Sequence, residues 1–364
     1  MTSDVAPNLA REILGMTLAQ YAAAVGQHPQ SARAQYKQMM RTGAGVELPA
    51  VLHRVDDAGT VKFCLPVGAY SGSGPAAGKA LETESVIIPM TSYRSSSWHT
   101  LCLSSQVGCR MGCTFCETGR MGLLKNLTAG EIVQQRLVAR QIRAEVLGGL
   151  APHYSYFADG VQNIVFMGMG EPLDNFDEVT QAIRVLSDPA GLDFPMSQIT
   201  VSTVGRIDGL RKLAALQWPN LRLAISLNAA TDKLRDELVP INKGMPLAEL
   251  QRAVLEYPLN RKGYWLIEYV LIKGVNDSLA DADAVAAWCK PLRCVVNLIP
   301  YNPQRGATYE TPSDETILAF MARLKTYKIF TKRRVTHGSD LMGACGQLGN
   351  PEIRRKAELK VLGS

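Results

Sequence analysis

Short apolar runs alternate with amphipathic stretches along the chain from about residue 100 onward. The apolar runs predict six strands: Leu101–Ser104, Asn163–Met167, Ile199–Thr203, Leu221–Leu227, Trp265–Ile272 and Cys294–Ile299. The stretches between them carry apolar residues at helical spacing and predict helices over 129–147, 176–187, 206–217, 247–257, 279–289 and 313–327. Strand–helix units in series build a parallel sheet with helices outside it, so we predict an α/β fold. Six units rather than eight favour an open, partial barrel.

The chain before residue 100 has a different pattern. Apolar residues from Leu9 to Val25 recur at helical spacing, and we expect short helices within 8–42. Two short strands are predicted at Lys62–Pro66 and Ser85–Pro89, separated by 68–79, which is rich in Gly, Ser and Ala and indicates a linker. These features predict three parts: a small N-terminal helical domain with short strands over 1–75, the barrel over 76–350, and a basic tail over 351–364.

Composition narrows the class of protein. The 364 residues are 46% hydrophobic, enough for a sizeable core, and no run of 18 apolar residues predicts a membrane span. Met1–Leu14 contains several polar residues and no apolar stretch of signal-peptide length, so we expect a cytoplasmic protein. The net charge of +6 permits an anionic partner such as RNA without requiring one. Basic residues are frequent near the C-terminal end, at Lys325, Lys328, Lys332, Arg333, Arg334, Arg354, Arg355 and Lys356.

Three of the eight cysteines lie close together in sequence. Cys109, Cys113 and Cys116 have the spacing C-x3-C-x2-C, directly after the first predicted barrel strand. Three thiolates at this spacing can hold an iron–sulfur cluster and leave its fourth iron open to chelate the amino and carboxylate groups of a methionine moiety. A structural zinc site usually needs four ligands. His99 lies ten residues before Cys109, too far to complete a zinc-binding motif with these cysteines. We therefore predict one [4Fe–4S] cluster per chain.

The cysteine motif, with Phe115 before its last cysteine, resembles the signature of the radical S-adenosylmethionine (SAM) superfamily. The longer string Leu101–Cys116 resembles one family within it, the RlmN/Cfr-type RNA adenine methyltransferases. Similar strings follow at Phe166–Leu173, Val201–Gly205, Ala224–Leu227, Val239–Asn242, Asn297–Asn302 and Ala344–Leu348. The resemblance implies a partial (β/α)6 TIM-like barrel of the radical SAM type, preceded by a shortened version of the family's small N-terminal helical domain.

The resemblance also implies how SAM is bound. Gly170 and Glu171 would contact it, with the Glu171 carboxylate holding its amino group. The ribose, carboxylate and adenine edges would be held by Ser202, Ser226, Asn228 and Asn302. Taken by themselves, Gly, Ser and Asn at such positions are ordinary turn formers, so these assignments depend on the family pattern.

The resemblance implies that Cys345 receives a methyl group from one SAM and that a second SAM is cleaved at the cluster. The deoxyadenosyl radical would then remove hydrogen from the S-methyl group, and the resulting carbon radical would add to an adenine carbon. Glu84 aligns with the family's proton acceptor, with Glu82 as a nearby alternative. Cys102 would attack the Cys345 sulfur, forming a transient disulfide that releases the product, although a buried strand cysteine can equally be core.

The implied activity is methylation of adenine, at C2 by default, in large-subunit ribosomal RNA and also in transfer RNA. It requires an electron donor such as a flavodoxin or ferredoxin, and no membrane partner is expected. The chain departs from the family at Asn228, where His is common, in Glu117–Asn126, and in its shortened N-terminal part. These departures leave open a C8-directed, resistance-type activity or a different RNA substrate. A radical SAM enzyme that acts on a small molecule or peptide is a separate alternative. A protein that only bound a cluster, without catalytic activity, would not need both Glu171 and Cys345, so this alternative is disfavoured.

Overall fold

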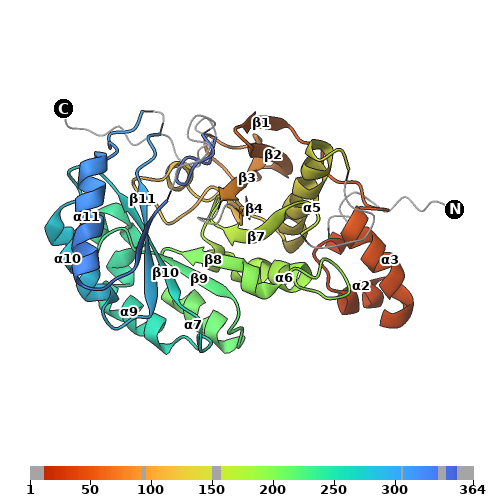
Figure 1. Ribbon diagram of the computed structural model, residues 1–364. Helices are drawn as coiled ribbons and strands as arrows, with labels where there is room; N and C mark the ends of the chain where they lie inside the picture. The colour runs from red at the N-terminus through yellow and green to blue at the C-terminus, as the bar shows by residue number, and fades with distance from the viewer. Residues whose placement is uncertain (1–11, 92–95, 150–156, 305, 335–341, 351–364) are drawn as a thin grey trace.

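The computed structural model describes residues 12–91, 96–149, 157–304, 306–334 and 342–350. One ten-stranded sheet organises the described chain, in the order β1-β2-β3-β4-β7-β8-β9-β10-β11-β12 (Figure 1). Its strands are β1 His53–Asp57, β2 Thr60–Ala69, β3 Ala80–Thr91, β4 Ser97–Cys102, β7 Val161–Phe166, β8 Ile199–Thr203, β9 Arg222–Ser226, β10 Trp265–Leu271, β11 Cys294–Pro300 and β12 Thr331–Arg333. A separate short pair joins β5 Gln106–Val107 to β6 Lys125–Asn126.

Strands β4 to β12 of the large sheet pair in parallel and form the partial barrel. All six predicted strands lie in it, which confirms the α/β class with a mostly parallel sheet. Strand β12 is a seventh parallel strand that the sequence pattern did not predict. It has only three residues, Thr331-Lys-Arg, two of them charged and exposed, so it lacks the apolar run that predicts a buried strand.

Helices cover the outer face of the barrel (Figure 1). The six predicted barrel helices are present as α5 Ala129–Val146, α6 Phe176–Leu186, α7 Ile207–Ala215, α9 Leu247–Glu256, α10 Leu279–Cys289 and α11 Asp314–Thr326. Helix α5 begins with the predicted capping box: Thr128 Oγ1 accepts from the Glu131 amide at 3.2 Å, and Glu131 Oε2 accepts from the Thr128 amide at 3.0 Å. Short helices α4 Glu117–Met121 and α8 Asp232–Leu238 lie in loops at the carboxyl ends of strands. No helix in the described ranges is both long enough and apolar enough to cross a membrane.

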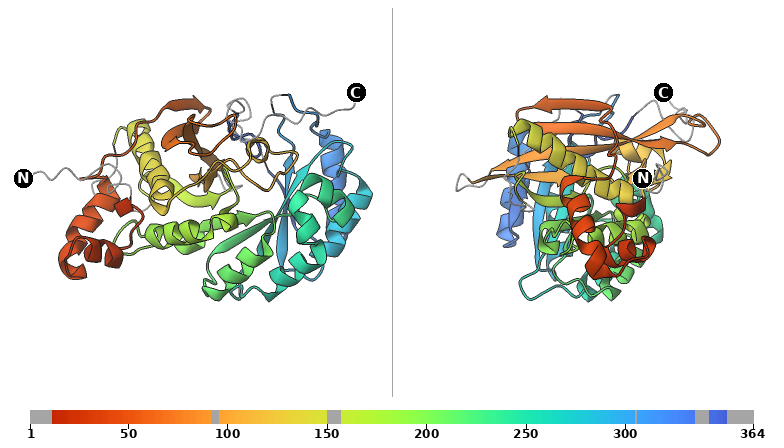
Figure 2. Two further views of the ribbon diagram at one scale, coloured as in Figure 1. Left: turned by 180° about the vertical axis from the view of Figure 1, so that it is seen from behind. Right: turned by 90° about the vertical axis from the view of Figure 1, so that its right-hand side faces the viewer.

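The N-terminal part of the chain is joined to the barrel in two ways. Helices α2 Leu18–Ala24 and α3 Pro29–Thr42 lie beside α6 (Figure 1), where the Gln181 amide donates to the Gly15 carbonyl at 2.8 Å. Strands β1 to β3 continue the barrel sheet beyond β4 as antiparallel strands (Figure 2). The predicted linker is the connection between β2 and β3, which pair directly, so the boundary predicted at residue 75 falls within one continuous sheet. The predicted tail 351–364 lies outside the described residues.

The barrel strands place every second side chain on the inner face. In consecutive strands, Cys102 pairs with Val165, Val165 with Thr200, and Thr200 with Arg222. All four side chains line one interior cavity of about 640 Å³. The register of the sheet therefore places Cys102 inside the barrel rather than against the outer helices.

Candidate active site

The predicted cluster ligands lie in the loop between β5 and α4. Cys109 and Cys113 are buried, Cys116 is partly buried, and they pack with Phe115 and Tyr301 in a small hydrophobic cluster of their own. The Cys116 amide donates to the Cys113 carbonyl at 3.2 Å, which fixes the turn that brings these two thiols onto one side.

The donor set of this loop suits an iron–sulfur cluster. Burial raises the pKa of the Cys109 thiol, and Cys116 and Cys113 raise it further, so the three thiols share one apolar pocket. No three His, Cys, Asp or Glu side chains among the described residues converge as they would around a single metal ion. In a cubane cluster each thiolate binds a different iron, so its sulfurs stand farther apart than the ligands of a tetrahedral zinc.

Arg235 lies near these thiols and was not identified from the sequence. This fully buried side chain of α8 donates to the Leu227 carbonyl at 3.0 Å, the Val204 carbonyl at 2.5 Å and Asn242 Oδ1 at 2.8 Å. Burial lowers the pKa of Arg235 to about 10, an effect that Cys113 opposes. The arginine ties together the loops after β8 and β9 and places positive charge near a thiol predicted to bind as a thiolate.

The turn after β7 requires glycine. Gly170 has φ +102°, and a Cβ built there would lie 2.6 Å from Gln106 Cβ, so no side chain fits. Gln106 Oε1 accepts from the Glu171 amide at 2.8 Å, and Gln106 Nε2 donates to Asp174 Oδ2 at 3.0 Å. This side chain therefore holds the turn that presents Glu171.

Glu171 is a buried carboxylate at the carboxyl edge of the barrel. Its Oε1 accepts from the Leu173 amide at 3.0 Å and its Oε2 from the Val204 amide at 2.9 Å. Burial raises the pKa of Glu171 to about 7, and these amide hydrogen bonds work against the rise. A buried carboxylate of this kind is a suitable partner for the ammonium group of an amino acid.

The other predicted SAM contacts lie on neighbouring strands. Ser202 Oγ of β8 and Ser226 Oγ of β9 are 3.3 Å apart. Asn228 follows β9 with φ +59°, a conformation that Asn tolerates better than most residues. Its Oδ1 accepts from the Val270 amide at 2.9 Å, so this atom already joins β9 to β10. Asn228 is therefore a backbone-bracing residue in this structure, and its contact with SAM stays a prediction.

Cys345 is carried by a loop that is fastened to the cluster loop. Asn302 Nδ2 donates to the Cys345 carbonyl at 3.1 Å, just beyond the end of β11. The next carbonyl, Gly346, accepts from Gln304 Nε2 at 2.9 Å and from the Glu117 amide at 2.8 Å. Asn302 therefore positions Cys345, a role that the resemblance did not suggest.

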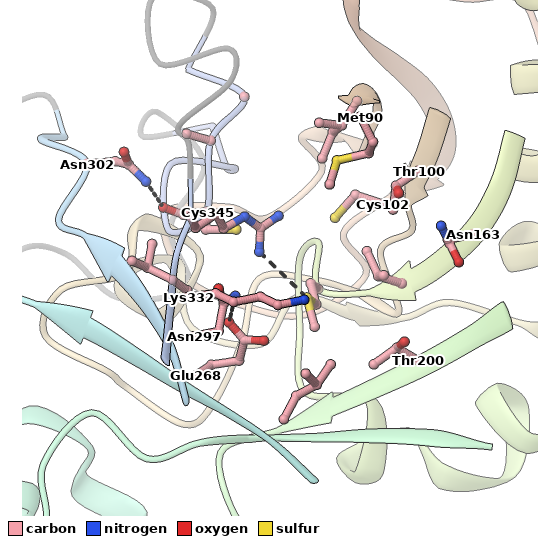
Figure 3. Close-up of a pocket in the computed structure, with 18 of the residues that line it drawn as sticks. Met90, Thr100, Cys102, Asn163, Thr200, Glu268, Asn297, Asn302, Lys332 and Cys345 are labelled. Carbon is pink, nitrogen blue, oxygen red and sulfur yellow. Dashed lines mark hydrogen bonds between the residues drawn. The ribbon is translucent and has the colours of Figure 1, made fainter. Parts of the chain in front are cut away.

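Cys102 and Cys345 face the same cavity, one from β4 and the other from the C-terminal loop (Figure 3). Burial raises the pKa of Cys102 to about 12, Cys345 raises it further, and Arg334 opposes both effects. The cavity also contains Glu268, whose Oε2 accepts from Asn297 Nδ2 at 2.7 Å. The three predicted cluster cysteines are not among the described residues that line it, so Cys102 and Cys345 occupy a different part of the site from these three thiols.

Glu84 is connected through Lys62 to the C-terminal loop that carries Cys345. Its Oε2 is 2.8 Å from Lys62 Nζ, and the same Nζ donates to the Met342 carbonyl at 3.0 Å. The alternative acid, Glu82, is more exposed and lies 3.8 Å from His53. Glu84 is therefore linked to the Cys345 loop through Lys62, but neither acid is among the described residues that line the cavity, and the role of Glu84 as proton acceptor stays a prediction.

Comparison with known proteins decides the family. Residues 103–284 match the model of the Radical SAM superfamily. The chain is 44% identical over 276 residues to the probable dual-specificity RNA methyltransferase RlmN 1 of Protochlamydia amoebophila, covering 76% of this chain and 72% of that one. It is 39% identical over 345 residues to the dual-specificity RNA methyltransferase RlmN of Methylorubrum extorquens, covering 90% and 78% of the two chains. The chain belongs to the RlmN family.

A solved structure supports the same assignment. The crystal structure of a radical SAM methyltransferase from Sphaerobacter thermophilus matches with a TM-score of 0.78 and 34% identity, over 92% of this chain and 98% of that one. As an RlmN-family member the protein uses a [4Fe–4S] cluster and SAM. All eight cysteines are free thiols in the structure, so the transient disulfide between Cys102 and Cys345 stays a prediction.

Proposed function

We propose that the protein is a radical SAM methyltransferase that methylates adenine C2 in RNA, in large-subunit ribosomal RNA and in transfer RNA. The observation that carries this proposal is the single cavity shared by Cys102 and Cys345 beside a three-cysteine loop. Its volume, about 640 Å³, falls within the usual range for small-ligand sites and is ample for one nucleobase. A methyl carrier and a thiol that can release it would then face the same bound base.

The cluster would be held by Cys109, Cys113 and Cys116, and when bound it supplies the electron that cleaves SAM. Glu171 would bind the amino group of SAM through its buried carboxylate, oriented by the amides of Leu173 and Val204. Ser202 and Ser226 would bind polar edges of the same molecule from adjacent strands. Asn302 would act through the Cys345 carbonyl that it already contacts.

The cavity thiols would perform the transfer. Cys345 would carry the methyl group into the cavity and, after hydrogen abstraction, form the bond to adenine. Glu84 would take the proton from the adenine carbon, and the one electron left by the radical addition would pass to a one-electron acceptor such as the bound cluster. Cys102 would then attack the Cys345 sulfur, so that a Cys102–Cys345 disulfide forms as the carbon–sulfur bond breaks and the freed carbon takes up a proton to become the methyl group. Arg334 supports these steps because its positive charge counteracts the effect of burial on the pKa of Cys102.

The partners follow from this chemistry. RNA is the substrate, and an electron donor such as a flavodoxin or ferredoxin remains a prediction. An RNA substrate of this kind implies that the enzyme works in the cytoplasm.

Mass spectrometry of nucleosides tests the proposal. Ribosomal and transfer RNA from a strain lacking the gene should lose 2-methyladenosine, and the purified, reduced enzyme with SAM should restore it. Formation of 8-methyladenosine instead would move the target carbon to C8. An RNA from the deletion strain that accepts no methyl group would contradict an RNA substrate.

A further inference from the structure

The cavity extends past the two redox thiols toward the amino ends of the barrel strands. Asn163, Thr200 and Arg222 line it, and they are the third, second and first residues of β7, β8 and β9. Arg222 and Lys332 both line the cavity and are both exposed to solvent. The cavity therefore reaches the surface at this edge, away from the carboxyl edge where Glu171 and the cluster loop lie.

The two cations at this opening have no acidic partner among the described residues. Lys332 of β12 pairs with Asn297 of β11, a cavity residue, and reaches into the cavity (Figure 3). Arg333, the next residue, instead forms an ion pair with Asp314 at 2.6 Å. Arg333 also lines the cavity, but its guanidinium is paired with Asp314, so Lys332 is the cation of β12 that has no acidic partner among the described residues.

An exposed aromatic ring accompanies Lys332. Phe330 is 61% exposed, the highest value for a large apolar side chain among the described residues. It stands directly before β12 and two positions before Lys332, and Lys332 Nζ lies 5.7 Å from the centre of its ring. The Phe330 carbonyl accepts from the Val296 amide at 3.0 Å, so the backbone beneath the ring is fixed by the sheet.

A ring and two unpaired cations at a cavity opening match the chemistry of single-stranded RNA. Sequence-tolerant RNA sites combine aromatic side chains on which bases stack with cations that contact the phosphates. An adenine that reaches Cys345 must leave its base stack, so its neighbours need a surface that supports the opened strand. A small uncharged substrate would have no use for these groups.

We propose that RNA enters the active site across an entry surface formed by Arg222, Phe330 and Lys332. A base next to the target adenine stacks on Phe330, the flanking phosphates contact Lys332 and Arg222, and the adenine occupies the cavity. This inference rests on the proposed function, because it identifies how the RNA substrate of that same site is held.

Substitution of the ring tests the stacking contact. Phe330→Ala should weaken binding of protein-free large-subunit ribosomal RNA, and raise the KM for it, by about 5- to 100-fold, the usual range for loss of one stacked base. Phe330→Trp should restore binding, which a purely structural role of Phe330 would not predict. Leu318→Ala is the matched control, because Leu318 is 58% exposed on α11 and lies outside the entry surface. Iron content per chain checks that each variant is folded.

Salt dependence tests the phosphate contacts. Lys332→Ala and Arg222→Ala should each lower the slope of log affinity against log salt concentration by about 0.7, the value for one phosphate of a single strand. Lys212→Ala is the control, because Lys212 Nζ lies 5.8 Å from the Phe176 ring in an equivalent pair on the outer helices. The slope of log affinity against log salt concentration for Lys212→Ala should equal that of the wild type.

The outcomes separate the two proposals. If the wild type methylates RNA while the Arg222, Phe330 and Lys332 variants keep its affinity and salt slope, the entry surface is overturned and the proposed function stands. If the wild type methylates no RNA, the proposed function fails, and the entry surface fails with it.

Discussion

Lys62 Nζ lies 2.8 Å from Glu84 Oε2 and donates at 3.0 Å to the Met342 carbonyl, three residues before Cys345. The lysine comes from β2, outside the parallel barrel, whereas Glu84 is on β3 and Met342 begins the described part of the C-terminal loop. Both side chains are largely buried. The proposed base is thus held by a cation that also contacts the loop of the methyl carrier.

Removal of this cation should affect both stability and turnover. Lys62→Met leaves a buried carboxylate without its partner, which typically costs about 3 to 5 kcal/mol of unfolding free energy. Urea unfolding under anaerobic conditions measures it. Glu84→Gln removes the base and should slow methylation by about 10²- to 10⁴-fold.

The double variant Lys62→Met/Glu84→Gln provides the control. Because it removes both charges, it should regain much of the stability lost in Lys62→Met. Equal instability of the single and double variants would show that the ion pair is not the cause.

The barrel and the cluster loop were predictable because their signals are local. Each parallel strand is an apolar run of a few residues, and Cys109, Cys113 and Cys116 lie within eight positions of one another. Cys345 lies far from these three cysteines in the sequence, in a Gly-containing segment that by itself predicts only a turn. It was identified through the family resemblance. That the cavity also contains Cys102 depends on the sheet register, which the apolar pattern alone does not define.

The residues that were missed act over long distances in sequence. Lys62 contacts Met342 across 280 positions, and Arg235 joins loops after two different strands through backbone carbonyls. In the sequence both are ordinary basic residues of a strand and a helix. The segment 68–79 shows the same limit: Gly, Ser and Ala mark a turn, but only the pairing of β2 with β3 shows that the turn connects a hairpin. The domain division at residue 75 stays a prediction.

The raised pKa of Glu171 predicts a pH dependence of apoprotein stability. A carboxyl group with a pKa of about 7 when folded and about 4.3 when unfolded binds its proton more tightly in the native state. Stability should therefore fall as pH rises from about 4.5 to 7, by up to about 1.4 kcal/mol per pH unit from this group. Glu171→Gln should flatten that part of the profile in urea unfolding. An unaltered slope would show that Glu171 has an ordinary pKa.

The cluster assignment predicts iron content. Anaerobically reconstituted protein should hold about four irons with a broad visible absorption, since three thiolates and the inorganic sulfides complete the coordination. Cys113→Ala should lose both, whereas Cys64→Ala should retain both, because Cys64 lies on β2 away from the cluster loop. A native protein that contains only zinc would refute the assignment.

The shared cavity of Cys102 and Cys345 predicts a trapped intermediate. Once a methylene group joins Cys345 to adenine, the link breaks only when a second thiolate attacks the Cys345 sulfur. Cys102→Ala should therefore permit addition to RNA but prevent release, and the variant expressed in cells should accumulate as an RNA–protein adduct. Denaturing gels should show a shifted band that nuclease removes. Phosphate binding cannot produce that band, because it is salt-sensitive and does not survive denaturation.

Two variants make this test specific. Cys345→Ala and the double variant Cys102→Ala/Cys345→Ala should give no adduct, because the carrier atom is absent. Cys289→Ala should turn over normally, since Cys289 is buried at the end of α10 on the outer layer. Sequencing the trapped RNA would then identify the methylated nucleotide. Normal turnover by Cys102→Ala without trapped RNA would refute the disulfide step and remove the main support for RNA as the substrate.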